Sequence, residues 1–272
     1  MWRKIKSLNI LKKVFNQLAY NKKLATIVYN KKIQKKFGLN LYDYRRLSGK
    51  YKEENNDKIS IYNSYNHKLL FKGNYSNRQK NGNGEEYNDD GELIFIGEYL
   101  DGKKWKGTEY IYDEDTGNKI LKCELINGEK NGRVKEYDKY NGDLIFEGVY
   151  LNGKRNGTGI EYKSILCNQC DSRYYSKYNS NLIKIFEGEY LNDERIFGKE
   201  YNYDEKLIYE GGYLNGKRNG NVKIYENDKL KYEGEYLNGK RNGKGIEYNR
   251  KTDIIYIGEF LNGKRNGKGK EY

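Results

Sequence analysis

The residues that could catalyse a reaction or hold a metal are few in this chain of 272 residues. His67 is the only histidine, which argues against a hydrolase triad and excludes a site with several histidine ligands. Cys167 and Cys170 form a C-x-x-C pair, which is half of a zinc site, but the remaining candidate ligands, Cys123 and His67, lie in distant segments. The sequence therefore predicts no metal site and no cofactor.

Carboxylates are plentiful, but they recur at regular intervals, as on a solvated sheet face rather than in an acid–base pair. The segment Gly239-x-x-x-Gly243-Lys244-Gly245 invites comparison with a phosphate-binding loop. It has three residues between its glycines where such loops have about four, and Gly245 stands where Ser or Thr would bind magnesium. These features predict a protein that is not an enzyme.

Basic side chains are the remaining chemical signal, and they are concentrated at the N-terminus. Residues 1–42 hold 11 Lys and Arg and no acid, whereas the rest of the chain has 41 basic and 39 acidic residues. Trp2, Ile5 and Leu8 begin an apolar pattern at three- and four-residue steps, which predicts an amphipathic helix. One interpretation is an anchor on an anionic membrane surface. Its candidate contact residues are Arg3, Lys4, Lys6, Lys12 and Lys13.

Two other interpretations of residues 1–42 remain open. The segment is also interpretable as a helical cap that covers the first strand of the fold. Alternatively it is an adaptor module, because residues 7–34 resemble an F-box, although Ser7-Leu8-Asn9 replaces the Leu-Pro opening common in that family. No stretch reaches the roughly 18 apolar residues of a membrane-spanning helix, and lysines interrupt any signal-peptide core.

A second basic pattern recurs further along the chain, where four Lys-Arg pairs occupy the same position between two Asn-Gly pairs. Stacked hairpins would align these pairs at intervals of about 10 Å, a spacing that suits phosphates on a membrane or a nucleic acid. The competing interpretation is that edge lysines merely discourage aggregation of the sheet, since nearby glutamates balance the charge. We favour the second interpretation, and nucleic-acid binding is not expected. The residues are Lys154, Arg155, Lys217, Arg218, Lys240, Arg241, Lys264 and Arg265.

The elements that would position these residues follow from an internal repeat. An aromatic–x–Gly–x–aromatic phrase returns at intervals of 23 to 26 residues, apart from one interval of 40 that marks an insertion near residues 163–182. Units this small cannot bury a core alone, so they must stack. The anchor glycines are Gly73, Gly97, Gly148, Gly188, Gly211, Gly234 and Gly258, and Cys123 stands at the anchor position between Gly97 and Gly148.

Each repeat reads as a β-hairpin. Phe146, Gly148 and Tyr150 alternate onto one face of a strand, and the following Asn152-Gly153 suits a tight turn because both residues tolerate positive φ. We expect the glycine to leave room for a ring from the neighbouring unit. The predicted fold is mainly β, an elongated single-layer antiparallel sheet of hairpins over residues 43–272, with a short helical module at residues 1–42.

These repeats resemble the MORN repeat family, which has an aromatic–glycine–aromatic phrase, a loop rich in Asn and Gly, and a Gly-x-Gly strand. The resemblance covers about three quarters of the chain. It implies a non-enzymatic scaffold, often tied to membranes, the cytoskeleton or phosphoinositides. Cys123 replaces one anchor glycine, and two units are one residue short, where we expect Trp105 or Phe197 to fill the space.

The function expected from the sequence is that of a cytoplasmic interaction scaffold, with anionic phospholipids and other proteins as partners. Its basic N-terminus would place it on the cytosolic face of a membrane. The alternative is an adaptor whose N-terminal helices recruit a complex while the sheet binds a client protein. We also expect that two copies can pair through the last strand, where Lys268, Lys270 and Glu271 alternate in charge.

Overall fold

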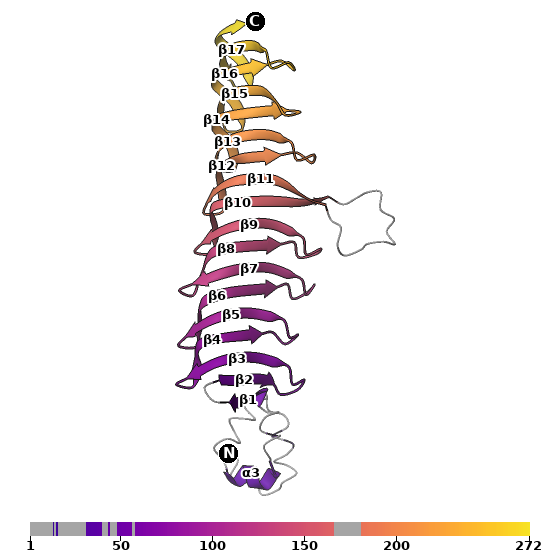
Figure 1. Cartoon of the computed structure of the whole chain (residues 1–272), viewed down its shortest axis with the longest axis vertical. Helices are drawn as coiled ribbons and strands as arrows, with labels where there is room; N and C mark the ends of the chain where they lie inside the picture. The colour runs from indigo at the N-terminus through magenta and orange to yellow at the C-terminus, as the bar shows by residue number, and fades with distance from the viewer. Residues whose placement is uncertain are drawn as a thin grey trace, which may run out of the picture. The chain divides into compact units, whose positions relative to one another are not determined.

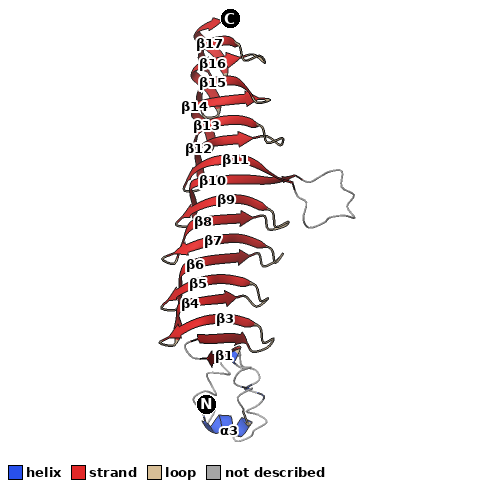
Figure 2. Ribbon diagram, in the orientation of Figure 1, coloured by secondary structure: helices blue, strands red, loops and turns tan. Residues whose placement is uncertain are grey.

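The computed structural model describes residues 13, 15, 31–39, 43, 48–55, 58–165 and 181–272. Within these residues the structure has 18 strands and the short helix α3 (Lys31–Phe37). Strands make up most of the described chain in Figures 1 and 2. The chain divides into two compact units, Met1–Gly107 and Thr108–Tyr272. The predicted mainly-β class is confirmed.

In the first unit, each of the first four strands pairs antiparallel with the next strand in sequence. Strand β6 contains the boundary between the units in the sequence. These strands are β1 (Lys50–Asn55), β2 (Lys58–Asn63), β3 (Leu69–Ser76), β4 (Gln79–Tyr87), β5 (Leu93–Leu100) and β6 (Lys103–Tyr112).

The second unit repeats this antiparallel pairing in chain order from β7 to β18, which confirms the predicted hairpin array (Figure 1). Its strands are β7 (Lys119–Ile126), β8 (Glu129–Tyr137), β9 (Leu144–Leu151), β10 (Lys154–Ile165), β11 (Asn181–Leu191), β12 (Glu194–Tyr201), β13 (Leu207–Leu214), β14 (Lys217–Glu226), β15 (Lys229–Leu237), β16 (Lys240–Tyr248), β17 (Ile254–Leu261) and β18 (Lys264–Glu271).

The predicted insertion lies at the connection between β10 and β11. These two strands continue their pairing as far as Ile165 and Asn181, so they are longer than the strands around them. The intervening residues 166–180, which include Cys167 and Cys170, lie outside the described residues.

The hairpin turns follow from Asn-Gly pairs. In the turn between β9 and β10, Asn152 has φ of 52° and Gly153 has φ of 76°. Positive φ at both central residues gives the turn whose twist matches that of the flanking strands. The same Asn-Gly combination recurs at Asn238 and Gly239, with φ of 51° and 83°.

The core of each hairpin is an aromatic ring laid over paired glycines. Gly148 of β9 faces Gly159 of β10, and the fully buried ring of Phe146 covers both. A Cβ atom at Gly159 would lie 2.5 Å from Cε2 of Phe146 and 3.1 Å from Cε2 of Tyr190 in the next hairpin. The predicted ring against bare backbone is thus present, but its main source is the same hairpin. The neighbouring hairpin adds Tyr190 edge-on to Phe146, at 5.3 Å between ring centroids.

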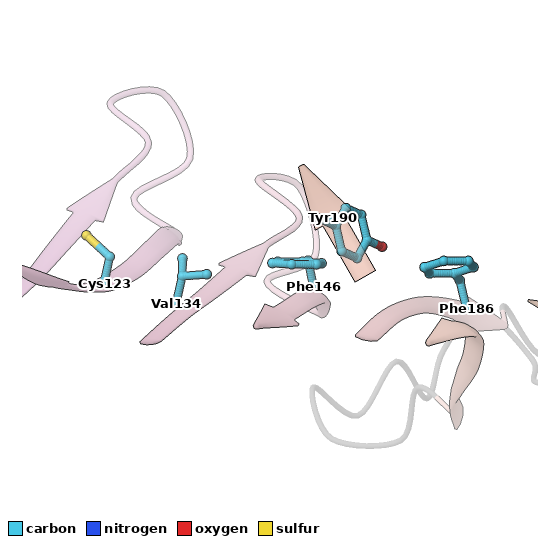
Figure 3. Close-up of a cluster of buried hydrophobic side chains, with 5 residues drawn as sticks. All are labelled: Cys123, Val134, Phe146, Phe186 and Tyr190. Atoms are coloured by element: carbon cyan, nitrogen blue, oxygen red, sulfur yellow. The ribbon is translucent and has the colours of Figure 1, made fainter. Parts of the chain in front are cut away.

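Two hairpins fill this space differently. In β13 and β14, Val222 stands at the second glycine position, opposite Gly211. In β7 and β8 the ring position is Leu121, and the two glycine positions are Cys123 and Val134, which pair with each other and are buried. Figure 3 shows Cys123 and Val134 in a row with Phe146, Tyr190 and Phe186. In β7 and β8 a smaller side chain at the first position therefore accompanies larger side chains at the other two, which keeps the packed volume similar.

The two shorter units place their large side chains at the surface. Trp105 and Phe197 are 37% and 49% exposed, so neither ring is buried in the core. Phe197 directly precedes Gly198, whose missing side chain faces the ring of Phe186. Because neighbouring strand residues point to opposite faces, Phe197 is directed away from that ring.

Candidate functional site

The sheet of the second unit has two different faces. The aromatic face carries the rings that cover the glycines, such as Phe146 and Tyr209. The opposite face, here called the groove face, carries the residues directly before and after each anchor glycine, such as Glu147 and Val149 around Gly148.

The arginines of the four Lys-Arg pairs lie on the aromatic face, although the sequence suggested that they belong to loops. The guanidinium carbon of Arg155 lies 4.0 Å from the ring centroid of Phe146, and its Nη2 lies 2.8 Å from Oε2 of Glu136. Arg218 repeats this arrangement over Tyr209 at 4.3 Å, with its Nη2 2.5 Å from Glu200. Arg241 and Arg265 likewise stack on aromatic rings and pair with glutamates. The arginines therefore stabilise the array, as cations stacked on rings and paired with carboxylates.

Contacts of this kind lower the pKa of two glutamates on this face. Burial alone would raise the pKa of Glu161, but hydrogen bonds from Arg195 and the Tyr190 hydroxyl outweigh it and lower that pKa below its ordinary value. The same balance, with Arg218 and Tyr213 as donors, lowers the pKa of Glu200.

The lysines of the pairs have a different environment. Lys154, Lys217, Lys240 and Lys264 are exposed, and each is the cross-strand partner of a leucine that ends the preceding strand. The leucines are about half exposed and recur once per hairpin, a regularity that the sequence analysis missed although a leucine before Asn-Gly was visible. They are Leu151, Leu214, Leu237 and Leu261.

A groove runs across the strands on the groove face, and its floor is the backbone of the paired glycines. One stretch forms a cavity of about 860 Å³ from Thr108 of β6 to β12, lined among others by Val149, Thr158, Phe197 and Lys199. A second stretch of about 840 Å³ lies over β12 to β18. Phe197 lines both cavities, so this exposed ring stands between them.

The glutamates in this groove are largely engaged by groups of their own sheet. Glu147 accepts hydrogen bonds from the Tyr162 hydroxyl at 2.6 Å and lies 2.9 Å from Nζ of Lys135, and both contacts lower its pKa. Burial and this hydrogen bond raise the pKa of Tyr162 to about 12. Glu233 is likewise bound by Tyr248, also at 2.6 Å.

A further group of glutamates caps an irregularity in the hairpins. After the second Asn-Gly pair the ladder shifts its register, and the next backbone N–H donates to the glutamate that follows the anchor position. Lys244 donates in this way to Glu235 at 3.2 Å, and Arg133 donates to Glu124 at 2.9 Å. The carboxylate thus replaces a ladder partner that the shift removes.

The remaining predicted site residues divide between described and undescribed parts of the chain. Lys13 is exposed, whereas Arg3, Lys4, Lys6 and Lys12 lie outside the described residues. In the part of the chain that the structure describes, no helix is long and apolar enough to span a bilayer, and no three potential metal ligands come together. The ring of His67 lies within hydrogen-bonding distance, 3.1 Å, of the Tyr51 hydroxyl.

The fold and the groove define a class of protein, a scaffold built from repeated antiparallel β-hairpins. Comparison with protein families supplies the particular repeat. The MORN repeat model matches residues 146–164, 209–221, 232–250 and 256–272, so the chain carries MORN repeats. This repeat family is generally non-enzymatic, and its repeats suggest a scaffold or interaction protein.

Other comparisons add little. No curated protein matches the chain. Among solved structures, the chain is similar to alternansucrase in complex with isomaltononaose, at 11% identity over 76% of this chain and 16% of that one. The TM-score is 0.15, which is too low to bear on fold or function.

Proposed function

We propose that the protein is a non-enzymatic scaffold that binds a segment of a partner protein along the groove of the second unit. The observation that supports this best is the exposed ring of Phe197 between two cavities on one face. Aromatic side chains in concave surfaces are typical anchors of protein interfaces. The rings and arginines of the opposite face are already engaged with one another, so they offer less to a partner.

A peptide-display selection on the full chain tests this proposal, with random 20-residue peptides as the probe. Binding of the selected peptides should be lost in Phe197→Lys and kept in Ile196→Lys. Ile196 is a matched control because it is adjacent in sequence, 38% exposed and absent from the lining of both cavities. Peptides that bind Phe197→Lys as well as the unchanged protein would contradict the groove as the docking site.

A second part of the proposal concerns residues 1–42 and the location of the protein. The net charge of +11 in this segment supports peripheral attachment to an anionic membrane on its cytosolic side. In sedimentation with vesicles that contain anionic lipid, deletion of residues 1–42 should abolish binding, and binding by the full chain should weaken with salt. If the deletion has no effect and charge reversal at Lys217 and Lys240 abolishes binding, the exposed lysines of the repeats are the membrane contact instead.

The alternative role for the same segment is an F-box-like adaptor. The pattern of Leu11, Val14, Phe15 and Leu18 supports it, and Phe15 is buried. An adaptor would retain its docked complex after high-salt washing in a pull-down with residues 1–42, whereas an electrostatic membrane anchor would bind no protein under those conditions.

A further inference from the structure

Two hairpins of the groove lack the glutamate that caps the register shift in their neighbours. The position after the anchor is Glu124, Glu235 or Glu259 in three units, and each of these carboxylates accepts a backbone N–H. In two other units of the same length that position is Val149 or Gly212. The corresponding N–H groups, on Thr158 and Asn221, therefore have no glutamate cap in their own hairpin.

The space that the carboxylate occupies elsewhere is open in these two hairpins. A Cβ atom at Gly243 would lie 2.5 Å from Oε2 of Glu235, and one at Gly132 would lie 2.4 Å from Oε2 of Glu124. At the equivalent Gly157 and Gly220 such an atom would meet nothing within 4 Å. All four glycines have positive φ, between 71° and 98°, so the turn backbone is alike in the hairpins with and without the glutamate. Only the carboxylate is missing at Gly157 and Gly220.

The two open positions lie on either side of Phe197. Thr158 is on β10 and lines the first cavity, Asn221 is on β14 and lines the second, and Phe197 is on β12 between them. Four strand spacings separate Thr158 from Asn221, which amounts to about 19 Å. The groove thus presents two places for a carboxylate with an apolar contact midway.

The charged side chains that line the two cavities nearly balance, with seven basic and eight acidic residues. Most groove glutamates are engaged by tyrosines, lysines or backbone N–H groups of the sheet, as for Glu147 and Glu235. Lys199, Lys223 and Lys244 each lie opposite a glutamate of a neighbouring strand. The open cap positions, rather than an excess of basic side chains, therefore favour a carboxylate ligand.

We propose that the groove binds an amphipathic helix of a partner protein, whose two carboxylates cap the open positions at Thr158 and Asn221 on either side of an apolar residue against Phe197. A helix rises about 1.5 Å per residue, so acids at i and i+14 with an apolar residue at i+7 share one face and span about 21 Å. An extended segment of that length has about six residues, and its midpoint side chain points away from the other two. This inference rests on the proposed function of the groove and specifies its ligand.

The test uses the full chain and a display library of helical 20-residue peptides with randomised surface positions. We expect the selected peptides to carry acids about 14 residues apart with a large apolar residue between them. Changing either acid to Gln should weaken binding about tenfold, as for the loss of one charge-assisted hydrogen bond. Peptide binding should also slow hydrogen exchange at the Thr158 amide.

A variant of the protein provides a second, independent readout. Val149→Glu places a carboxylate where Glu235 stands in its own hairpin, so it should cap Thr158 internally, slow its amide exchange without peptide, and weaken peptide binding about tenfold. Val149→Thr is the matched control, with similar volume and no carboxylate, and should weaken binding less than Val149→Glu. Peptides that need Phe197 but show no acid preference and tolerate Val149→Glu would overturn this inference and leave the docking groove intact. Peptides indifferent to Phe197 would overturn both.

Discussion

The ring-over-glycine packing makes a quantitative prediction for the hairpin of β9 and β10. Gly159→Ala would introduce a Cβ atom 2.5 Å and 2.6 Å from two ring atoms of Phe146. Favourable carbon contacts lie at about 3.5–4.0 Å, so the overlap is about 1 Å. The ring has little freedom to move, because Arg155 stacks on it at 4.0 Å and Tyr190 packs against it at 5.3 Å.

The expected cost of Gly159→Ala is therefore that of overpacking, about 1–3 kcal/mol. Phe146→Leu alone should cost about 1 kcal/mol, since it exchanges one buried apolar side chain for another of similar volume. Leucine lacks the two ring atoms that the new Cβ overlaps, so the double variant should cost little more than Phe146→Leu. The coupling between the two changes should thus be about 1–2 kcal/mol in favour of the double variant.

Urea unfolding of the protein and its three variants, followed by circular dichroism, measures this coupling as shifts of the midpoint at constant slope. The unit with Leu121, Cys123 and Val134 already combines a smaller first residue with larger partners, so the double variant copies an arrangement that the chain contains. Costs that simply add, or a double variant less stable than the sum predicts, would refute steric conflict with the ring as the reason for glycine.

Three further predictions concern charge. Hydrogen bonds hold the pKa of Glu161 in the folded protein below its ordinary value of 4.5. The stability that Glu161 contributes is therefore present above pH 4.5 and should decline as the pH falls below it. A melting temperature that stays constant down to about pH 2 would contradict this prediction. The pKa values of Tyr162 and Tyr248 are raised to about 12. The stability that these tyrosines contribute should therefore persist to about pH 10 and be lost as the pH rises through 12. Alkaline unfolding, followed by the tyrosinate absorbance, measures this loss. Arg241→Ala should lower the unfolding free energy by about 2 kcal/mol, because it removes a partly buried ion pair stacked on a ring. Lys240→Ala should change the unfolding free energy by less than about 0.5 kcal/mol, because this lysine is exposed. Equal effects of the two variants in urea titrations would contradict the different environments of the two side chains.

The hairpins were predictable from the sequence because their signals are local. Asn152 and Gly153 specify the turn by their own conformational preferences, and the alternation around Gly148 places Phe146 on the buried face. Helical structure at residues 31–37 also agrees with the predicted helical module, of which the remainder lies outside the described residues.

The side on which the loop arginines lie was harder to predict. Arg155 lies four residues before Gly159 on one strand, so strict alternation places both on the aromatic face, but the sequence suggested that the arginine belongs to the turn. The pairing with β9 shifts its register between the two residues. Stacking on Phe146 and pairing with Glu136 depend on that shift and on a neighbouring hairpin. The groove was missed because its lining combines residues from as many as seven strands.

The alternation of faces has a consequence for how such an array can change over time or by engineering. Substitutions of the residues after the anchor, which are Glu124, Val149, Glu189, Gly212 and Glu235 in successive hairpins, alter the groove without touching the rings on the opposite face. In most hairpins the ring, the paired glycines and the stacked arginine recur while these positions vary. The proposed binding groove can therefore change one hairpin at a time. The residues at these positions, in their order along the chain, would determine which partner the groove binds.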